Sequence, residues 1–160
     1  LKGNEIQAEE SSTRDYIGQA LSINGDGTII AIGVPDHSGI IARAGCALMY
    51  QWNGNDWIKM GNTIYANTRL DMLGESVSIN GDGTIVAIGS PYYNWSSTDN
   101  ADGATFIYKW NGNDWALMGN RIDASTTGEQ FGHSVSIDSE GSKVAFGAYH
   151  YQSHIGTTRI

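Results

Sequence analysis

The sequence GESVSINGDGTIVAIGSP, residues 74–91, organises the whole chain because versions of it occur three times. A near copy, GQALSINGDGTIIAIGVP, occupies residues 18–35, and a looser copy, GHSVSIDSEGSKVAFGAY, occupies residues 132–149. Successive copies start 56 (74 − 18) and 58 (132 − 74) residues apart. A second element, WNGNDW, begins at Trp52 and again at Trp110, also 58 residues apart (110 − 52). A period of this length predicts a repeat architecture.

Each repeat is expected to form four antiparallel β-strands. In the first repeat, residues 20–23 alternate small or polar with apolar side chains, which is typical of a strand. The Asn-Gly-Asp-Gly of residues 24–27 predicts a tight hairpin turn. Residues 28–33 are apolar on both sides and predict a central strand covered on both faces. Residues 46–52 and 56–64 are the third and fourth predicted strands.

Four strands in about 58 residues are typical of one blade of a β-propeller. We therefore predict an all-β chain with blades at residues 18–73 and 74–131, and the first half of a further blade at 132–160. Residues 1–17 are the expected last strand of a split blade plus a connection, because the opening LKGNEI aligns with LMGNRI from Leu117.

The predicted blades are too few to close a ring, because propellers close with about four to eight. A blade is apolar on both faces and needs neighbours to cover it. We therefore expect a partial or oligomer-completed propeller. Three arrangements stay open: an excerpt from a longer repeat array, two copies that share the split blades, or an open filament.

The composition excludes several classes of function. The 160 residues carry a net charge of −8 and no basic run, which argues against nucleic-acid binding. No apolar run approaches the roughly 18 residues of a membrane-spanning helix, and no signal peptide is recognisable. Cys46 is the single cysteine, so neither an intrachain disulfide nor a thiolate metal site is expected.

Several short motifs resemble FG-GAP repeats, the blades of integrin-α-like β-propellers. They are FGHSVS at residues 131–136, AFGA at 145–148, IGSP at 88–91 and IGVP at 32–35. The SINGDGT turn and the YxWNGxxW hairpin are similar to the short-turn subtype found in large secreted or surface proteins. The resemblance implies a propeller fold, an extracellular or cell-surface location and no particular chemistry, since propellers host many functions.

One departure from that family concerns calcium. Integrin-type repeats often carry a DxDxDG calcium loop between the first two strands. Here the same place holds NGDG at residues 24–27, NGDG at 80–83 and DSEG at 138–141. Calcium takes about six to eight oxygen ligands, and a turn this tight cannot surround an ion. We expect no metal and no cofactor.

The connections between predicted strands fall into two classes. The turns after the first and third strands are short and nearly invariant, whereas the connections after the second and fourth strands are long and variable. In an antiparallel blade the two classes lie at opposite ends. A binding function is therefore expected at the end with the long connections.

Aromatic and histidine residues in these long connections are the candidate ligand-binding residues. They are Tyr92, Tyr93, Trp95, Tyr149, His150 and Tyr151. Such side chains can stack on sugar rings or anchor a protein partner, and the alternative is that they pack against neighbouring blades. Asn94 opens the sequence Asn-Trp-Ser, which makes it the candidate N-glycosylation site if the chain is secreted.

Other residues fit structural roles or weak sites. The four tryptophans of the two WNGNDW elements are expected to pair across strands. His150 and His154 lack a third zinc ligand, and the loop residues Asp99, Asn100 and Asp102 could hold a weak cation or simply be solvated. His133 has no catalytic partner in the pattern, and no nucleophile motif is present, so we expect no enzyme.

The sequence therefore predicts a non-catalytic, extracellular repeat module for adhesion, for surface or filament assembly and for ligand display. Its expected partners are proteins or copies of itself, with glycans as a further class, and neither nucleic acid nor membrane insertion. The alternative is a lectin-like propeller that binds carbohydrate through its aromatic loop residues.

Overall fold

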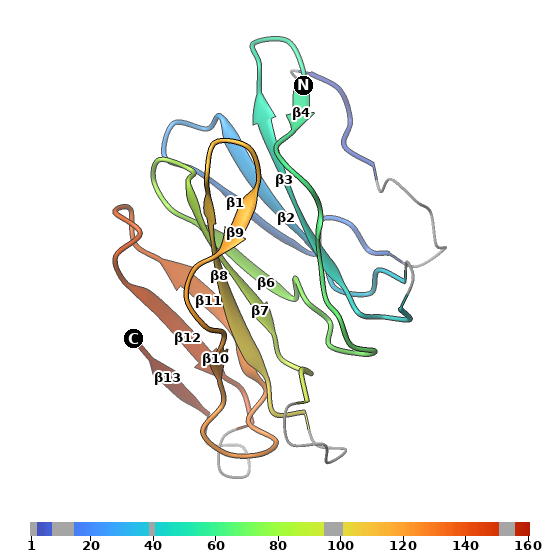
Figure 1. Ribbon diagram of the computed structural model, residues 1–160, viewed down its shortest axis with the longest axis vertical. Helices are drawn as coiled ribbons and strands as arrows, with labels where there is room; N and C mark the ends of the chain where they lie inside the picture. The colour runs from blue at the N-terminus through green and yellow to red at the C-terminus, as the bar shows by residue number, and fades with distance from the viewer. Residues whose placement is uncertain (1–2, 8–14, 39–40, 95–100, 151–155) are drawn as a thin grey trace.

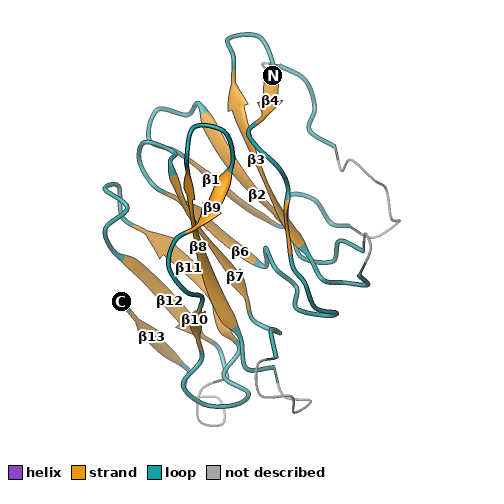
Figure 2. Ribbon diagram, in the orientation of Figure 1, coloured by secondary structure: helices purple, strands orange, loops and turns teal. Residues whose placement is uncertain are grey.

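The computed structural model describes residues 3–7, 15–38, 41–94, 101–150 and 156–160. Strands, turns and loops make up all of these residues, and none of them is helical (Figure 2). The strands form three antiparallel sheets. The prediction of an all-β chain is confirmed.

Each sheet takes its strands from consecutive sequence. The first contains β1 (Ala20–Ile23), β2 (Ile29–Val34), β3 (Cys46–Trp52), β4 (Trp57–Lys59) and β5 (Ile64–Tyr65). The second contains β6 (Ser76–Ile79), β7 (Ile85–Ser90), β8 (Ala104–Trp110), β9 (Trp115–Leu117) and β10 (Ile122–Asp123). The third contains β11 (Phe131–Ile137), β12 (Val144–Ala148) and β13 (Thr157–Arg159).

The first two sheets share one pairing plan. In the first, β1 pairs with β2, β2 with β3, and β3 with both β4 and β5. In the second, β6, β7 and β8 pair in the same succession, and β8 pairs with both β9 and β10. The third sheet has the order β11-β12-β13. The apolar strands β2 and β7 are central, as their sequences predict.

Side chains in the Asn-Gly-Asp-Gly-Thr turn stabilise it through hydrogen bonds to its own backbone. Asn24 Oδ1 accepts hydrogen bonds from the backbone N–H groups of Thr28 (2.9 Å) and Ile29 (2.8 Å). Asp26 Oδ1 accepts from the Thr28 amide and hydroxyl, and these bonds hold the pKa of Asp26 below its usual range. Gly27 has φ +75°, which favours glycine. The turn oxygens are therefore occupied by the chain itself.

The predicted fourth strand at residues 56–64 is wrong as a single element. It is two short strands, β4 and β5, separated at Gly61, whose φ of +76° interrupts the ladder. The Met60 amide still donates to the Met49 carbonyl at 2.8 Å, so the segment stays beside β3. The second sheet divides in the same way into β9 and β10 at Gly119, with φ +73°.

The predicted strand at the start of the chain is also absent from its described part. Residues 3–7 form no strand. They are attached to the first sheet through Asn4, whose Oδ1 accepts from the Trp57 amide at 2.8 Å, while Gly3 lies against the Trp52 ring. Side-chain contacts thus replace the expected strand ladder.

The sheets stack face to face, as the layers in Figure 1 show. The largest core cluster lies between the first and second sheets, where Ala31 and Met49 meet Val77 and Ile88. A smaller cluster around Phe131, Phe146 and Ala148 joins the second sheet to the third. Apolar burial between each pair of neighbouring sheets therefore holds the stack together.

Small residues let the sheets approach very closely. The Ile79 amide donates to Ser22 Oγ at 3.1 Å, and the Ile137 amide donates to Ser78 Oγ at the same distance. At Gly33, an added β-carbon would lie 1.9 Å from the Gly74 carbonyl oxygen of the next sheet. Serine, alanine and glycine on one face of each sheet therefore receive the larger apolar face of the next.

Candidate functional site

The two ends of the stacked sheets differ in their connections. The short turns gather along the upper left of Figure 1, and the long connections after β2, β5, β7 and β10 gather along the lower right. The described aromatic candidates belong to the end with the long connections. We call it the loop end.

Tyr93 packs within the second sheet. Its ring meets the Phe106 ring edge-on, with centroids 5.9 Å apart, and the Arg121 guanidinium lies 4.9 Å above it. Arg121 also donates through Nε to Asp123 Oδ1 at 2.7 Å. Tyr92 beside it is 40% exposed. Tyr93 therefore packs against the protein, which was the alternative to ligand binding, whereas Tyr92 is accessible to a ligand.

Tyr149 belongs to a second aromatic group on the third sheet. Its ring stacks on His133 with centroids 5.1 Å apart and an interplanar angle of 25°, and the His150 ring lies 4.5 Å away. Tyr149 is 60% exposed. The His150 amide donates to the Glu129 carbonyl at 3.0 Å, which attaches this loop to the preceding connection.

The candidate residues therefore form two groups instead of one site. Tyr92 and Tyr93 belong to the second sheet, and Tyr149 and His150 to the third. Trp95 and Tyr151 lie outside the described residues, as do Asp99, Asn100 and His154. Asn94 is half-buried and interacts with its surroundings, and its glycosylation stays a prediction.

A hollow of about 150 Å³ adjoins Tyr93 at the loop end, between the first and second sheets. It is lined on one side by residues that follow β5, including Asn67 and Asp71, and on the other by Ser90, Tyr93 and Arg121. A volume of this size is large enough for several water molecules, at about 30 Å³ each. Leu73 and Phe106 also line the hollow, so its walls are part polar and part apolar, and it lies beside the variable loops.

Asp71 gives this hollow its unusual electrostatic character. The residue is only 2% exposed, and burial raises the pKa of its carboxyl group from 3.8 to about 6, against an opposing effect of hydrogen bonds from Thr68. Among the described residues, Asp71 Oδ1 has no hydrogen-bond partner. A buried carboxylate oxygen in this state favours protonation or a hydrogen-bond donor from outside the protein.

Each repeat has a buried acid at this position. Asp15 in the preceding connection pairs with His37 Nδ1 at 3.1 Å. Glu129 before β11 accepts from the hydroxyl groups of Ser125 (2.8 Å) and Thr126 (2.7 Å). The shared role is therefore to fasten the long connection, and Asp71 differs by leaving one oxygen without a partner.

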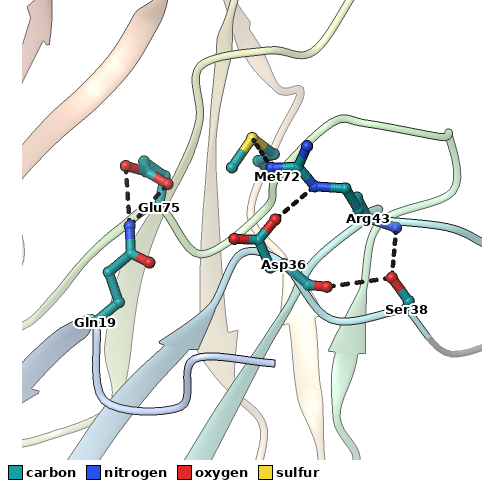
Figure 3. A network of polar contacts seen from close by, with 6 residues as sticks. All are labelled: Gln19, Asp36, Ser38, Arg43, Met72 and Glu75. Carbon is teal, nitrogen blue, oxygen red and sulfur yellow. Dashed lines mark hydrogen bonds and ion pairs between the residues drawn. The ribbon is translucent and has the colours of Figure 1, made fainter. Parts of the chain in front are cut away.

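A polar network also fastens the connection between β2 and β3 at the loop end (Figure 3). Arg43 Nε donates to Asp36 Oδ1, and the Arg43 amide donates to Ser38 Oγ at 2.9 Å. The guanidinium reaches Met72 in the connection between β5 and β6, 4.0 Å from its sulfur. This part of the loop end is held by its own ion pair and is therefore not a free anion site.

The tryptophan pairs have the predicted structural role. Trp52 faces Trp57 across strands, and Trp110 faces Trp115, each with ring centroids 5.5 Å apart. Trp115 Nε1 additionally donates to the Met60 carbonyl at 2.8 Å. These rings join neighbouring repeats. In the described part of the chain, no three His, Cys, Asp or Glu side chains are grouped so as to hold a metal ion.

Sequence reasoning missed Asp71 and Arg121 as members of a possible site. The signal for Asp71 was present, because SSTRD, NTRLD and STTGE align in the three connections and end in an acid. Arg121 gave no signal, since its contact with Tyr93 depends on how β10 pairs with β8.

Comparisons with known proteins add no family. No protein-family model matches the chain, and no curated protein matches its sequence. Within the described residues, no helix is long and apolar enough to cross a membrane. The resemblance to FG-GAP repeats therefore stays a prediction based on the motifs themselves.

Proposed function

We propose that the chain is a non-catalytic module of an extracellular or cell-surface β-propeller built from FG-GAP-like blades. The observation that carries the proposal is the common pairing plan of the first two sheets, together with their face-to-face stacking. In this proposal the interrupted strands β4–β5 and β9–β10 are the outer strands of their blades. The third sheet then supplies three strands of a further blade.

In this proposal the loop end binds other proteins for adhesion or assembly. Support comes from the contrast between the two ends: the turns are occupied by their own hydrogen bonds, whereas Tyr92 and Tyr149 expose large aromatic surface among variable connections. Exposed tyrosines are common anchors in protein interfaces. The acidic net charge favours partners with a basic surface.

Binding of immobilised matrix glycoproteins by the whole chain tests this proposal. The Tyr92→Ser/Tyr149→Ser double variant is expected to lose binding by about tenfold or more, since truncating an interface anchor costs at least about 1.4 kcal/mol. Leu117→Ser is the matched control, because Leu117 is 46% exposed on β9, away from the long connections. Equal binding by both variants would contradict the proposal.

A lectin-like function is the second candidate, and the exposed Tyr149 favours it. The His133–Tyr149 stack holds the tyrosine ring in a fixed orientation beside a hollow of about 570 Å³ lined by Ser134, Thr157 and Thr158. A fixed aromatic face beside hydroxyl groups suits a sugar ring. A glycan array with Tyr149→Ser distinguishes the candidates, because only the lectin predicts a glycan signal that this variant removes.

A further inference from the structure

The outer face of the first sheet is an apolar surface that the described residues cover only in part. Ile6 and Ile17 pack on the cluster around Ile32, whereas the β1 side chains on this face stay exposed. Leu21 is 55% exposed and Ile23 is 56% exposed. The equivalent residues of the second sheet, Val77 and Ile79, are 8% and 6% exposed. The difference arises because the first sheet covers that face of the second, whereas no sheet covers the first.

The third sheet has an uncovered face of the other kind, with small residues where the first sheet has large apolar ones. Ala87 of the second sheet is fully buried beneath the third, whereas the equivalent Ala145 is only half-buried. Ser136 is exposed, although its counterpart Ser78 accepts the Ile137 amide across the sheets. The small residues on the free face of the third sheet are therefore uncovered. In the first and second sheets, the equivalent small residues are covered by the apolar face of the next sheet.

The contacts of the first sheet with the second, and of the second with the third, show which residues would pair if the two uncovered faces met. The serine-to-amide bond occurs in the pairs Ser22–Ile79 and Ser78–Ile137, so the next pair in the series is Ser136 with Ile23. The short approach of glycine to a backbone carbonyl occurs in the pairs Gly33–Gly74 and Gly89–Gly132. The next pair in that series is Gly147 with Gly18.

We propose that the outer face of the first sheet docks on the free face of the third sheet in a second copy of the chain. The Ile23 amide donates to Ser136 Oγ of the second copy, and Leu21 and Ile23 cover its small residues. This inference deepens the proposed function and rests on its stacking of repeats, but not on ligand binding at the loop end.

The repeated serine and glycine contacts favour a second copy over an unrelated apolar partner. The outer face of the first sheet has an apolar hollow between Ile6 and Ile17 on one side and Leu21 on the other, and the free face of the third sheet carries the small residues that receive such an apolar face elsewhere in the stack. An unrelated apolar partner would have no need of the serine and glycine positions. A copy of the chain carries both complementary faces already.

The contact is heterologous, because two different faces of the chain meet. A head-to-tail contact leaves one free face at each end, so association continues until a ring closes or a filament grows. Each copy carries a net charge of −8, which opposes association. Since salt screens charge repulsion, association is expected to strengthen as ionic strength rises above about 0.1 M.

Sedimentation velocity of the 160-residue chain over a concentration series tests the proposal. The wild-type chain is expected to form species that are multiples of 17.2 kDa. Ile23→Arg and Ser136→Arg each place a guanidinium in one of the two faces, and each is expected to weaken association by about tenfold or more. Both positions are exposed in the single chain, so the variants are expected to fold, which circular dichroism checks.

The matched control is Ile58→Arg. Ile58 is 51% exposed and lies on β4, outside the outer face of the first sheet and on a different sheet from Ser136. This variant is expected to associate like the wild type. If it abolishes association to the same degree as Ile23→Arg, the loss reflects added charge and the proposal is overturned.

Mixing the two blocked variants gives the decisive result. Each variant retains one intact face, so a mixture of Ile23→Arg and Ser136→Arg is expected to form a heterodimer of about 34 kDa (2 × 17.2) and nothing larger. A wild-type chain that stays monomeric at all concentrations overturns the proposal, as does a variant that still forms homodimers. Binding of matrix glycoproteins by the single variant Tyr92→Ser decides the ligand-display proposal independently of these results, because Tyr92 does not line the hollow on the third sheet, whereas Tyr149 does.

Discussion

Replacing Gly33 by alanine measures how strictly the first two sheets require their close approach. Gly33 lies in the central strand β2, and its added β-carbon would be 1.9 Å from the Gly74 carbonyl oxygen. Real β-carbons do not approach other atoms closer than 3.0 Å, so the gap must widen by about 1.1 Å (3.0 − 1.9). The obstacle is backbone and cannot rotate away.

The expected loss of stability follows from these contacts. Overpacking of a rigid interior costs about 1–3 kcal/mol. Moving the sheets apart also strains the hydrogen bond from the Ile79 amide to Ser22 Oγ, which contributes about 1 kcal/mol. Alanine regains about 0.5–1 kcal/mol over glycine in a strand because it restricts the unfolded chain. The net expectation is a loss of about 1–3 kcal/mol in the free energy of unfolding.

Urea unfolding of the dilute, monomeric chain provides the assay, with Gly147→Ala as the matched control. Gly147 holds the equivalent position in β12, but its added β-carbon would meet only the Ser134 side chain closely, with the oxygen at 2.2 Å and the next atom at 3.6 Å. That hydroxyl can rotate, so the control is expected to stay within about 0.5 kcal/mol of the wild type. Equal losses for Gly33→Ala and Gly147→Ala would refute the reasoning.

Two further substitutions test the buried polar groups. The pKa of Asp71 is raised to about 6 in the folded chain, so the folded state binds the proton more tightly than the unfolded state, and stability falls as pH rises from about 4 to 7. The loss is at most about 3 kcal/mol, at about 1.4 kcal/mol per pH unit, and Asp71→Asn is expected to remove this component from the pH profile of the urea midpoint. Asn80 is 2% exposed and accepts from the Thr84 and Ile85 amides, so Asn80→Ala is expected to lower the free energy of unfolding by about 2–3 kcal/mol. Asn111→Ala, which removes two comparable bonds at an exposed turn, is expected to cost about 1 kcal/mol or less, and a reversed order in urea unfolding would contradict this explanation.

Local sequence was sufficient to predict the positions of most strands and of the tight turns. The alternation in residues 20–23 and the Asn-Gly-Asp-Gly that follows gave β1, its turn and β2 within a residue or so of their observed bounds. It failed at the predicted fourth strand, which Gly61 divides through its positive φ. Gly119 divides the second sheet in the same way although nothing lies within 4 Å of an added β-carbon there, so the break follows from the glycine conformation and not from packing. Residues 3–7 lack the partner strand that a ladder needs.

The residues of the candidate site could be predicted from the sequence only in part. The loops that vary between repeats were identifiable, because their length and composition change while the turns do not. Which loop residues lie together was not, since Tyr93 meets Arg121 and Tyr149 meets His133 across 28 (121 − 93) and 16 (149 − 133) residues of chain. Those distances are set by strand pairing within each sheet.

The sequence by itself determined the period, the strands and the turns of this protein, because hydrophobic alternation and Asn-Gly chemistry act over a few residues. Tertiary structure alone decided which faces are covered. Leu21 and Val77 occupy the same place in their repeats, yet one is exposed and the other buried. Burial depends on what packs against a face, and in this chain the sheet that covers Val77 includes β1, whose residues are more than fifty positions away in the sequence.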